Sequence, residues 1–214
     1  MNPYKITADF EQALCDYTGA KYAVCVNSCT AALQLCVEWC DGRAWKAIAK
    51  PITVISIPKH TYVSVPMAII NAGCSVAWRD EKWRGAYQLK HFPIWDAARR
   101  FTYGMYKDGF QCISFASSKI LGMEQGGAIL HSNDDADIWF RAMRFDGRTE
   151  GTMPHSATVQ NIGHHCIMLP SVAAQGLLRL HHLPRQNDDM PDYPYPDLST
   201  FPVFSEENQM RRFK

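Results

Sequence analysis

Lys119 is the residue whose surroundings most clearly favour chemistry. An apolar stretch at residues 112–115 leads into small hydroxyl-bearing residues, and the lysine follows them directly. A glycine-rich turn and a second apolar stretch at residues 128–130 come next. A lysine on a loop between two buried strands is well placed to lose its proton and attack a carbonyl group. The competing interpretation is a surface lysine beside a turn.

A second polar group, formed by Ser28, Cys29 and Thr30, stands between an expected strand and an expected helix. Free backbone N–H groups at a helix start, together with two hydroxyl groups, suit the binding of a phosphate. Serine and threonine also cap helices without binding a ligand, so simple capping stays open as the alternative.

Two more side chains occupy comparable places. Tyr62 lies at the junction of a loop and a helix, where its ring can stack on a flat ligand, although packing in the core is the alternative. Asp96 follows an apolar stretch at residues 92–95 and precedes two alanines. That position predicts a carboxylate in a cleft, with a helix cap as the alternative.

The elements that must position these residues alternate between strand and helix patterns. Helices are expected at residues 8–18, 30–40, 62–72, 133–144 and 171–181, and strands at residues 22–26, 54–57, 75–78, 92–95, 112–115 and 128–131. This alternation predicts an α/β fold with a mostly parallel sheet and helices on both faces. Open α/β sheets place ligands at strand ends, where the four polar groups fall.

Together these groups supply a phosphate site, a stacking ring, a carboxylate and a lysine. That is the set needed to hold pyridoxal phosphate. In such a site Lys119 forms the Schiff base, and Asp96 keeps the pyridine nitrogen protonated so that the ring can act as an electron sink.

The same motifs, in the same order, resemble those of the DegT/DnrJ/EryC1/StrS family of sugar aminotransferases, which are fold-type I pyridoxal-phosphate enzymes. Residues 27–33 resemble the family's S-G-T-A-A-L turn, residues 58–64 its P-x-x-T-aromatic segment and residues 96–98 its D-A-A segment. Residues 114–127 resemble its S-F-x-x-T-K…E-G-G block, and residues 143–148 resemble its L-R-N-H-G-R segment. The resemblance runs from about residue 8 to about residue 180. It implies the large domain of a fold-type I aminotransferase.

The resemblance also implies a role for each site residue. The catalytic residues would be Lys119 and Asp96, and the cofactor would be held by Ser28, Cys29, Thr30, Tyr62, Asp96, Arg99, Ser114, Lys119 and His165. Ser114 would bind the phosphate, and His165 falls where the family has an asparagine that reaches the phosphate of the partner subunit's cofactor. Arg99 stands where the family has Gln or His near the phenolic oxygen, and a fixed cation there favours the phenolate.

The implied reaction is the transfer of an amine from glutamate or glutamine to a keto sugar, by resemblance a nucleotide-linked one, with pyridoxamine phosphate as the intermediate form of the cofactor. A homodimer with shared active sites is implied as well. Two alternatives stay open. The chain can be a pyridoxal-phosphate enzyme of another reaction type, or a non-catalytic binding or assembly subunit.

The chain differs from the family mainly by being short. Residues 79–91 replace a longer segment with a strand and a helix, and the C-terminal small domain is reduced. We expect residues 1–183 to form a shortened cofactor-binding domain and residues 184–214, rich in Pro and Asp, to form an extended arm. A gene trimmed in this way suits a genome under size pressure, such as that of a virus.

Composition excludes several other classes of protein. The 214 residues carry a net charge of +1, with 47% hydrophobic and 20% charged residues, which is typical of a soluble globular protein and argues against nucleic acid as a partner. We expect no membrane span and no secretory signal, and therefore a cytoplasmic location, in the host cytoplasm if the gene is viral. The eight cysteines lie mostly in apolar runs without a C-x-x-C pair, so we expect reduced core residues and no metal site.

Overall fold

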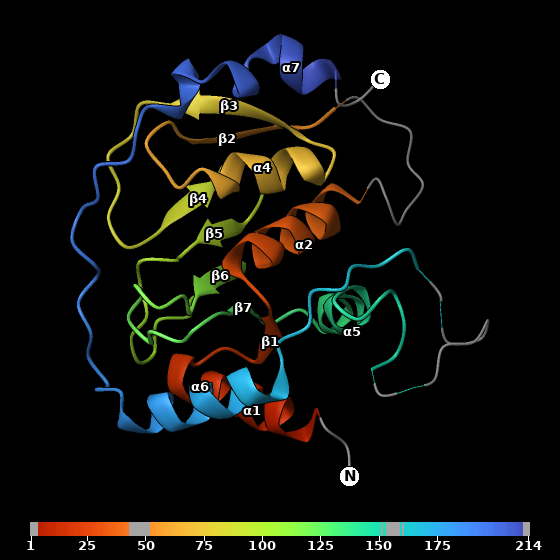
Figure 1. Ribbon diagram of the computed structural model, residues 1–214, viewed down its shortest axis with the longest axis vertical. Helices are drawn as coiled ribbons and strands as arrows, with labels where there is room; N and C mark the ends of the chain where they lie inside the picture. The colour runs from red at the N-terminus through yellow and green to blue at the C-terminus, as the bar shows by residue number, and fades with distance from the viewer. Residues whose placement is uncertain (1–3, 43–51, 151, 153–158, 160, 212–214) are drawn as a thin grey trace.

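Figure 1 shows the computed structural model, which describes residues 4–42, 52–150, 152, 159 and 161–211. The α-helices are α1 (Lys5–Thr18), α2 (Cys29–Asp41), α4 (Ser64–Asn71), α5 (Asp134–Met143), α6 (Pro170–His182) and α7 (Glu206–Arg211). The strands are β1 (Tyr22–Val26), β2 (Val54–Pro58), β3 (Ser75–Arg79), β4 (Tyr87–Leu89), β5 (Ile94–Asp96), β6 (Phe110–Ser114) and β7 (Gly127–His131). Two short 3-10 helices, η1 (Leu198–Thr200) and η2 (Pro202–Phe204), precede α7.

The central sheet has five strands in the order β1-β7-β6-β5-β4. Strands β5 and β6 are parallel, whereas β7 is antiparallel to both of its neighbours and β4 is antiparallel to β5. The parallel pair β2 and β3 lies beyond β4. Two backbone hydrogen bonds between Ser56 and Lys90, of 3.1 and 2.9 Å, join that pair to the end of β4.

The predicted α/β fold is confirmed, with a mixed sheet in place of the mostly parallel one that we expected. The difference follows from two connections. Residues 90–93 join β4 to β5, and residues 115–126 join β6 to β7. Neither connection contains a helix that could return the chain across the sheet, so each pair of joined strands runs antiparallel.

Helices cover both faces of the central sheet (Figure 1). Val24 and Val26 of β1 pack in the core cluster that includes α2 and α4, whereas Ala23 and Cys25 pack in the cluster that includes α1 and α6. Alternate residues of one strand are therefore buried on opposite faces. This explains why β1 is apolar along its whole length in the sequence.

Every helix and strand that the sequence predicted is present, with ends shifted by a few residues. Strand β4 was missed, because only Tyr87 and Leu89 of its three residues are buried and residues 79–92 read as irregular. Its single buried face offers too short an alternation to stand out.

The chain after α6 runs along one side of the molecule to α7, as the blue segment of Figure 1 shows. It contains no helix or strand between residues 184 and 197. Asp189 attaches it to the domain through an ion pair with Arg100 at 2.6 Å. The arm expected at residues 184–214 is extended only over residues 184–197, because η1, η2 and α7 follow, and the division into a domain and an arm stays our proposal. No helix among the described residues is long and apolar enough to cross a membrane.

Candidate active site

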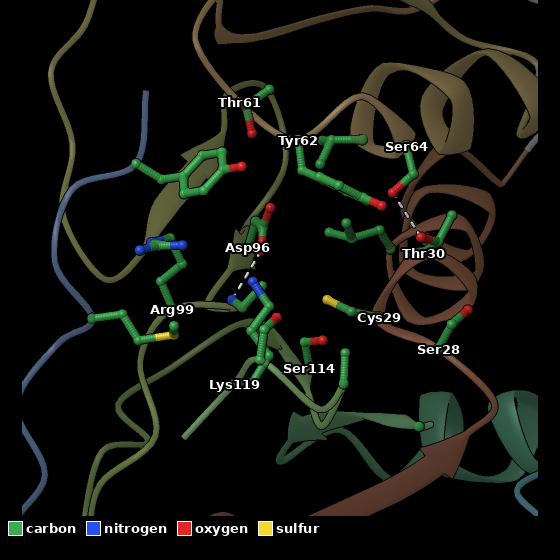
Figure 2. Close-up of a pocket in the computed structure, with 18 of the residues that line it drawn as sticks. Ser28, Cys29, Thr30, Thr61, Tyr62, Ser64, Asp96, Arg99, Ser114 and Lys119 are labelled. Atoms are coloured by element: carbon green, nitrogen blue, oxygen red, sulfur yellow. Dashed lines mark hydrogen bonds between the residues drawn. The ribbon is translucent and has the colours of Figure 1, made fainter. Parts of the chain in front are cut away.

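A cavity of about 690 Å³ opens where β5 and β6 end and α2 begins (Figure 2). Eight of the nine predicted site residues line it: Ser28, Cys29, Thr30, Tyr62, Asp96, Arg99, Ser114 and Lys119. They come from segments spread over more than ninety positions of the chain. The fold therefore brings together the groups that the sequence marked separately.

Asp96 is the last residue of β5, and its side chain is held firmly. The carboxylate accepts a hydrogen bond from the Ala98 N–H at 3.0 Å and another from the Tyr87 hydroxyl at 2.8 Å. The residue is only 5% exposed, and this burial raises the pKa of the carboxyl group. The two hydrogen bonds and the charge of Lys119 oppose that rise.

Tyr87 extends this arrangement to a third residue. Its hydroxyl lies 2.6 Å from the Thr61 hydroxyl, and both side chains are buried. Because the single Tyr87 proton goes to Asp96, the Thr61 hydroxyl must donate to Tyr87. Burial, followed by the charge of Asp96, raises the pKa of Tyr87 well above its ordinary value, so Tyr87 is a donor that stays protonated.

Lys119 lies on the loop after β6 and points into the cavity toward Asp96 (Figure 2). Its backbone N–H donates to the Ala116 carbonyl at 2.8 Å, which closes the turn that carries it. Burial lowers the pKa of the amino group, and the positive charge of Arg99 lowers it further, whereas Asp96 acts in the opposite direction. A lowered pKa makes the neutral, reactive amine more accessible at neutral pH.

The start of α2 forms the end of the cavity that lies opposite Arg99 (Figure 2). The Ser28 hydroxyl accepts a hydrogen bond from the Ala31 N–H at 3.1 Å, so capping, the alternative interpretation, does occur. The Thr30 hydroxyl lies 2.7 Å from that of Ser64. The Ser28 hydroxyl donates to the Asn27 side-chain oxygen at 3.2 Å, so a bond from this hydroxyl to a phosphate would replace that one while the cap stays in place.

Gly127 allows β7 to pass very close to the start of α2. A Cβ atom at this position would lie 2.5 Å from the backbone nitrogen of Cys29. Close packing thus explains why a glycine stands at this position, because any side chain would push the start of α2 away from the cavity.

Arg99 lines the cavity on the side away from Ser28 and Thr30 (Figure 2). Its guanidinium group donates to the Pro191 carbonyl and lies 3.5 Å from the Tyr195 hydroxyl. Both partners belong to the segment after α6, which therefore forms part of the cavity wall.

Most of the aromatic wall of the cavity was not predicted from the sequence. Tyr62 was predicted, and its side chain is 59% exposed at the cavity. Its ring packs edge-on against Tyr195 with 6.5 Å between centroids, and the Tyr195 ring stacks on Trp83 at 6.1 Å. Trp83 and Tyr195 come from the two segments that looked irregular, where only their aromatic character marked them.

His165 is the one predicted site residue that does not line this cavity. It lines a neighbouring hollow, which shares Asn27, Gln125 and Gly126 with the main cavity. Its ring lies 3.0 Å from the Asp146 carboxylate, and its side chain is 72% exposed. A role toward a partner subunit is consistent with this exposure and stays a proposal.

The cysteines take no part in disulfides. Five of the eight are buried. Cys29 lines the cavity, but burial raises the pKa of its thiol well above the ordinary value, which makes it a poor nucleophile. Among the described residues no cluster of three or more His, Cys, Asp or Glu side chains could hold a metal ion.

The cavity can hold a flat, anionic cofactor with a basic ring nitrogen. Asp96 is a buried carboxylate that forms no ion pair with any described residue, so a cationic ring nitrogen would offset the cost of its burial. The α2 start offers hydroxyl and N–H groups to a phosphate. These features fit pyridoxal phosphate.

Comparison with known proteins supports the same interpretation. Residues 1–82 match the DegT/DnrJ/EryC1/StrS aminotransferase family. The resemblance seen in the sequence is thus confirmed for this part of the chain. No match was found among curated proteins.

Solved aminotransferases share the fold. A DegT/DnrJ/EryC1/StrS aminotransferase from Brucella abortus matches with a TM-score of 0.65 and 17% identity, over 82% of this chain and 58% of that one. Helicobacter pylori PseC, an aminotransferase involved in pseudoaminic acid biosynthesis, matches with a TM-score of 0.67 and 17% identity, over 82% of this chain and 57% of its own. DesV from S. venezuelae matches with a TM-score of 0.63 and 19% identity, over 83% and 56%. The chain thus spans somewhat less than three-fifths of the length of these aminotransferases.

Proposed function

We propose that this chain is a pyridoxal-phosphate-dependent aminotransferase that moves an amine from glutamate or glutamine to a keto sugar, of the nucleotide-linked kind. The observation that carries the proposal is the placement of Lys119 and Asp96 in one cavity with the start of α2. The family match and the shared fold support it. A similar structure, Spr1654 from Streptococcus pneumoniae, was solved in pyridoxal-phosphate and pyridoxamine-phosphate forms.

Each residue has a distinct part in holding the cofactor. Ser28, Thr30 and Ser114 would bind the phosphate, and Tyr62 would stack on the ring. Asp96 would accept a hydrogen bond from the ring nitrogen and keep it protonated. Cys29 contributes through its backbone N–H at the helix start.

The bound cofactor supplies an electron sink for the carbanion formed when an amino acid loses its α-proton. Lys119 acts as the base that takes this proton and as the acid that returns it, because its amino group points to the centre of the cavity. Its lowered pKa suits both tasks near neutral pH. Tyr62, Trp83 and Tyr195 line the cavity, and their rings would shield part of a bound cofactor from water.

We also propose a cytoplasmic homodimer with shared active sites. His165 would then reach the phosphate held by the other subunit, in keeping with its exposure beside the cavity. Size-exclusion chromatography with light scattering tests this directly. A monomer that binds the cofactor at full strength would contradict the shared site.

The first experiment is a visible absorption spectrum of the purified protein mixed with pyridoxal phosphate. We expect a yellow protein whose band disappears when glutamate or glutamine is added. Reduction with borohydride followed by mass spectrometry should place the cofactor on Lys119. A protein that stays colourless would contradict the proposal, and a yellow protein that no amino acid bleaches would contradict the donor.

Tyr87→Phe should move the pH profile of the reaction. The Tyr87 hydrogen bond lowers the pKa of Asp96, so its loss raises that pKa beyond the rise already caused by burial. Activity needs the Asp96 carboxylate, and it should therefore fall at a higher pH in the variant than in the wild type. The acid limb of log kcat/KM against pH measures this shift. Tyr106→Phe, which removes a hydroxyl outside the cavity, is the matched control, and an unmoved limb in Tyr87→Phe would contradict the prediction.

A further inference from the structure

Arg99 differs from the other well-buried arginine of the described chain in lacking an acidic partner. It is 8% exposed, yet its polar contacts are the neutral Pro191 carbonyl and Tyr195 hydroxyl. Arg144, 2% exposed, pairs with both Glu11 and Glu150. The rings of Tyr193 and Tyr195, 5.8 and 6.0 Å from the Arg99 guanidinium carbon, add only weak attraction.

A buried cation without an anion is costly, and an anionic ligand would offset that cost. A guanidinium group suits a carboxylate because its parallel N–H groups match the two oxygens. We propose that Arg99 binds a carboxylate of the amino-acid donor, so that the cavity has an anion site of its own beside Lys119. This inference rests on the aminotransferase function proposed above.

The position of Arg99 favours the donor over the cofactor phosphate. In Figure 2 the start of α2, where the phosphate would bind, lies on one side of Lys119 and Asp96, and Arg99 lies on the other. Burial is the largest influence that lowers the pKa of Lys119, and the positive charge of Arg99 is the second. The two groups are therefore close enough to interact. An amino acid carries its α-carboxylate one carbon away from its amine. An amine that reacts beside Lys119 therefore carries its carboxylate into the part of the cavity that Arg99 also lines.

The segment after α6 holds Arg99 in this orientation. The Met190 N–H donates to the Arg99 carbonyl at 3.0 Å, and the Pro191 carbonyl accepts from the guanidinium group. The neighbouring Arg100 binds Asp189 of the same segment through two hydrogen bonds, of 2.8 and 2.6 Å. The guanidinium group is thus fixed before the ligand arrives, which reduces the entropy lost on binding.

Glutarate is the probe for this site, because it has both carboxylates of glutamate but no amine that could react. Its dissociation constant is measured by calorimetry on the protein saturated with pyridoxal phosphate. Arg99→Gln should weaken binding by about 10- to 100-fold, the usual effect of losing a charge-assisted hydrogen bond. Arg99→Lys should recover part of the loss, and Arg179→Gln, which removes an exposed charge outside the cavity, should leave binding unchanged.

A second measurement separates the α-carboxylate from other anions. Bleaching of the visible band is compared for glutamate and for 4-aminobutyrate, which lacks the α-carboxylate. With both proteins saturated with pyridoxal phosphate, wild type should react far better with glutamate, and Arg99→Gln should lose most of that preference. Equal glutarate binding by wild type and Arg99→Gln would overturn the inference. So would a variant that loses affinity for uridine diphosphate alone, since Arg99 would then serve a phosphate of the acceptor.

If the proposed aminotransferase function is wrong, the visible spectrum gives a different result. A wild-type protein that forms no visible band with pyridoxal phosphate overturns the aminotransferase proposal itself. A wild-type protein that forms the band and is bleached by glutamate, with Arg99→Gln behaving identically, overturns only the role of Arg99.

Discussion

Lys119→Ala should lower kcat by about 10²- to 10⁴-fold or more, the range expected when a positioned general acid–base group is lost. The amino group of Lys119 points into the cavity toward Asp96 (Figure 2), and Arg99 is the one other cationic side chain among the described residues that line it. A fixed guanidinium group cannot replace it as a base, because arginine keeps its proton in proteins. No other cationic group among the described residues of the cavity can therefore take over the proton transfer.

Single-turnover kinetics with glutamate measure this effect on the chemical step itself. Thermal unfolding should change little, since Lys119 forms no ion pair among the described residues and its side chain is only partly buried. Lys107→Ala, which truncates an exposed lysine outside the cavity, is the matched control and should retain full activity. A Lys119→Ala protein that turns over normally would exclude the proposed function.

Glu11→Ala should have the largest effect on stability, about 3–5 kcal/mol, as for breaking other buried ion pairs. Glu11 is 4% exposed, and its carboxylate accepts hydrogen bonds from Arg144, from Arg141 at 2.6 Å and from the Cys25 N–H at 2.8 Å. The truncation leaves the nearly buried Arg144 with a single carboxylate partner, Glu150. It also leaves a backbone N–H of β1 without its acceptor.

Urea unfolding monitored by circular dichroism measures the loss. Asp9→Ala removes an exposed carboxylate of the same helix, whose pair with Lys5 is worth at most about 1 kcal/mol. A loss for Glu11→Ala no larger than that for Asp9→Ala would contradict the prediction.

The stability from Glu11 should also depend on pH. Burial alone would raise the pKa of this carboxyl group, but Arg144 and Arg141 outweigh burial, and the pKa is lowered in the folded state. A group with a lowered folded pKa stabilises the protein fully above its unfolded pKa, about 4.3 for Glu. This stability is lost as the pH falls from there through the folded pKa. Wild type should lose stability over that interval, and Glu11→Ala should lose less.

The sequence predicted the helices and strands well because both have strong apolar patterns. Strands such as β1 and β7 are buried on both faces and read as continuous apolar runs. The sequence did not show that β7 runs antiparallel to its neighbours, because the direction of a strand depends on whether the connection before it carries a helix across the sheet. The chain between β6 and β7 has turns instead.

The site was predictable where a residue follows a strand or starts a helix. Asp96, Ser114 and Lys119 have such positions and do line the cavity. Thr61, Tyr87 and Tyr195 were missed because each acts through contacts between distant segments. Tyr87 is recognisable only once β4 is paired with β5, which sets its hydroxyl beside Asp96.

One feature of the C-terminal segment bears on how the protein behaves at high concentration. The Gln209 side chain of α7 accepts a hydrogen bond from the Val76 N–H at 2.7 Å and donates to the Val76 carbonyl at 3.4 Å. It thereby occupies two backbone groups of β3, an edge strand of the two-stranded sheet formed by β2 and β3. An open strand edge is a template on which other chains can pair and aggregate. Because Gln209 already binds two backbone groups of β3, α7 hinders the pairing of further copies along this strand.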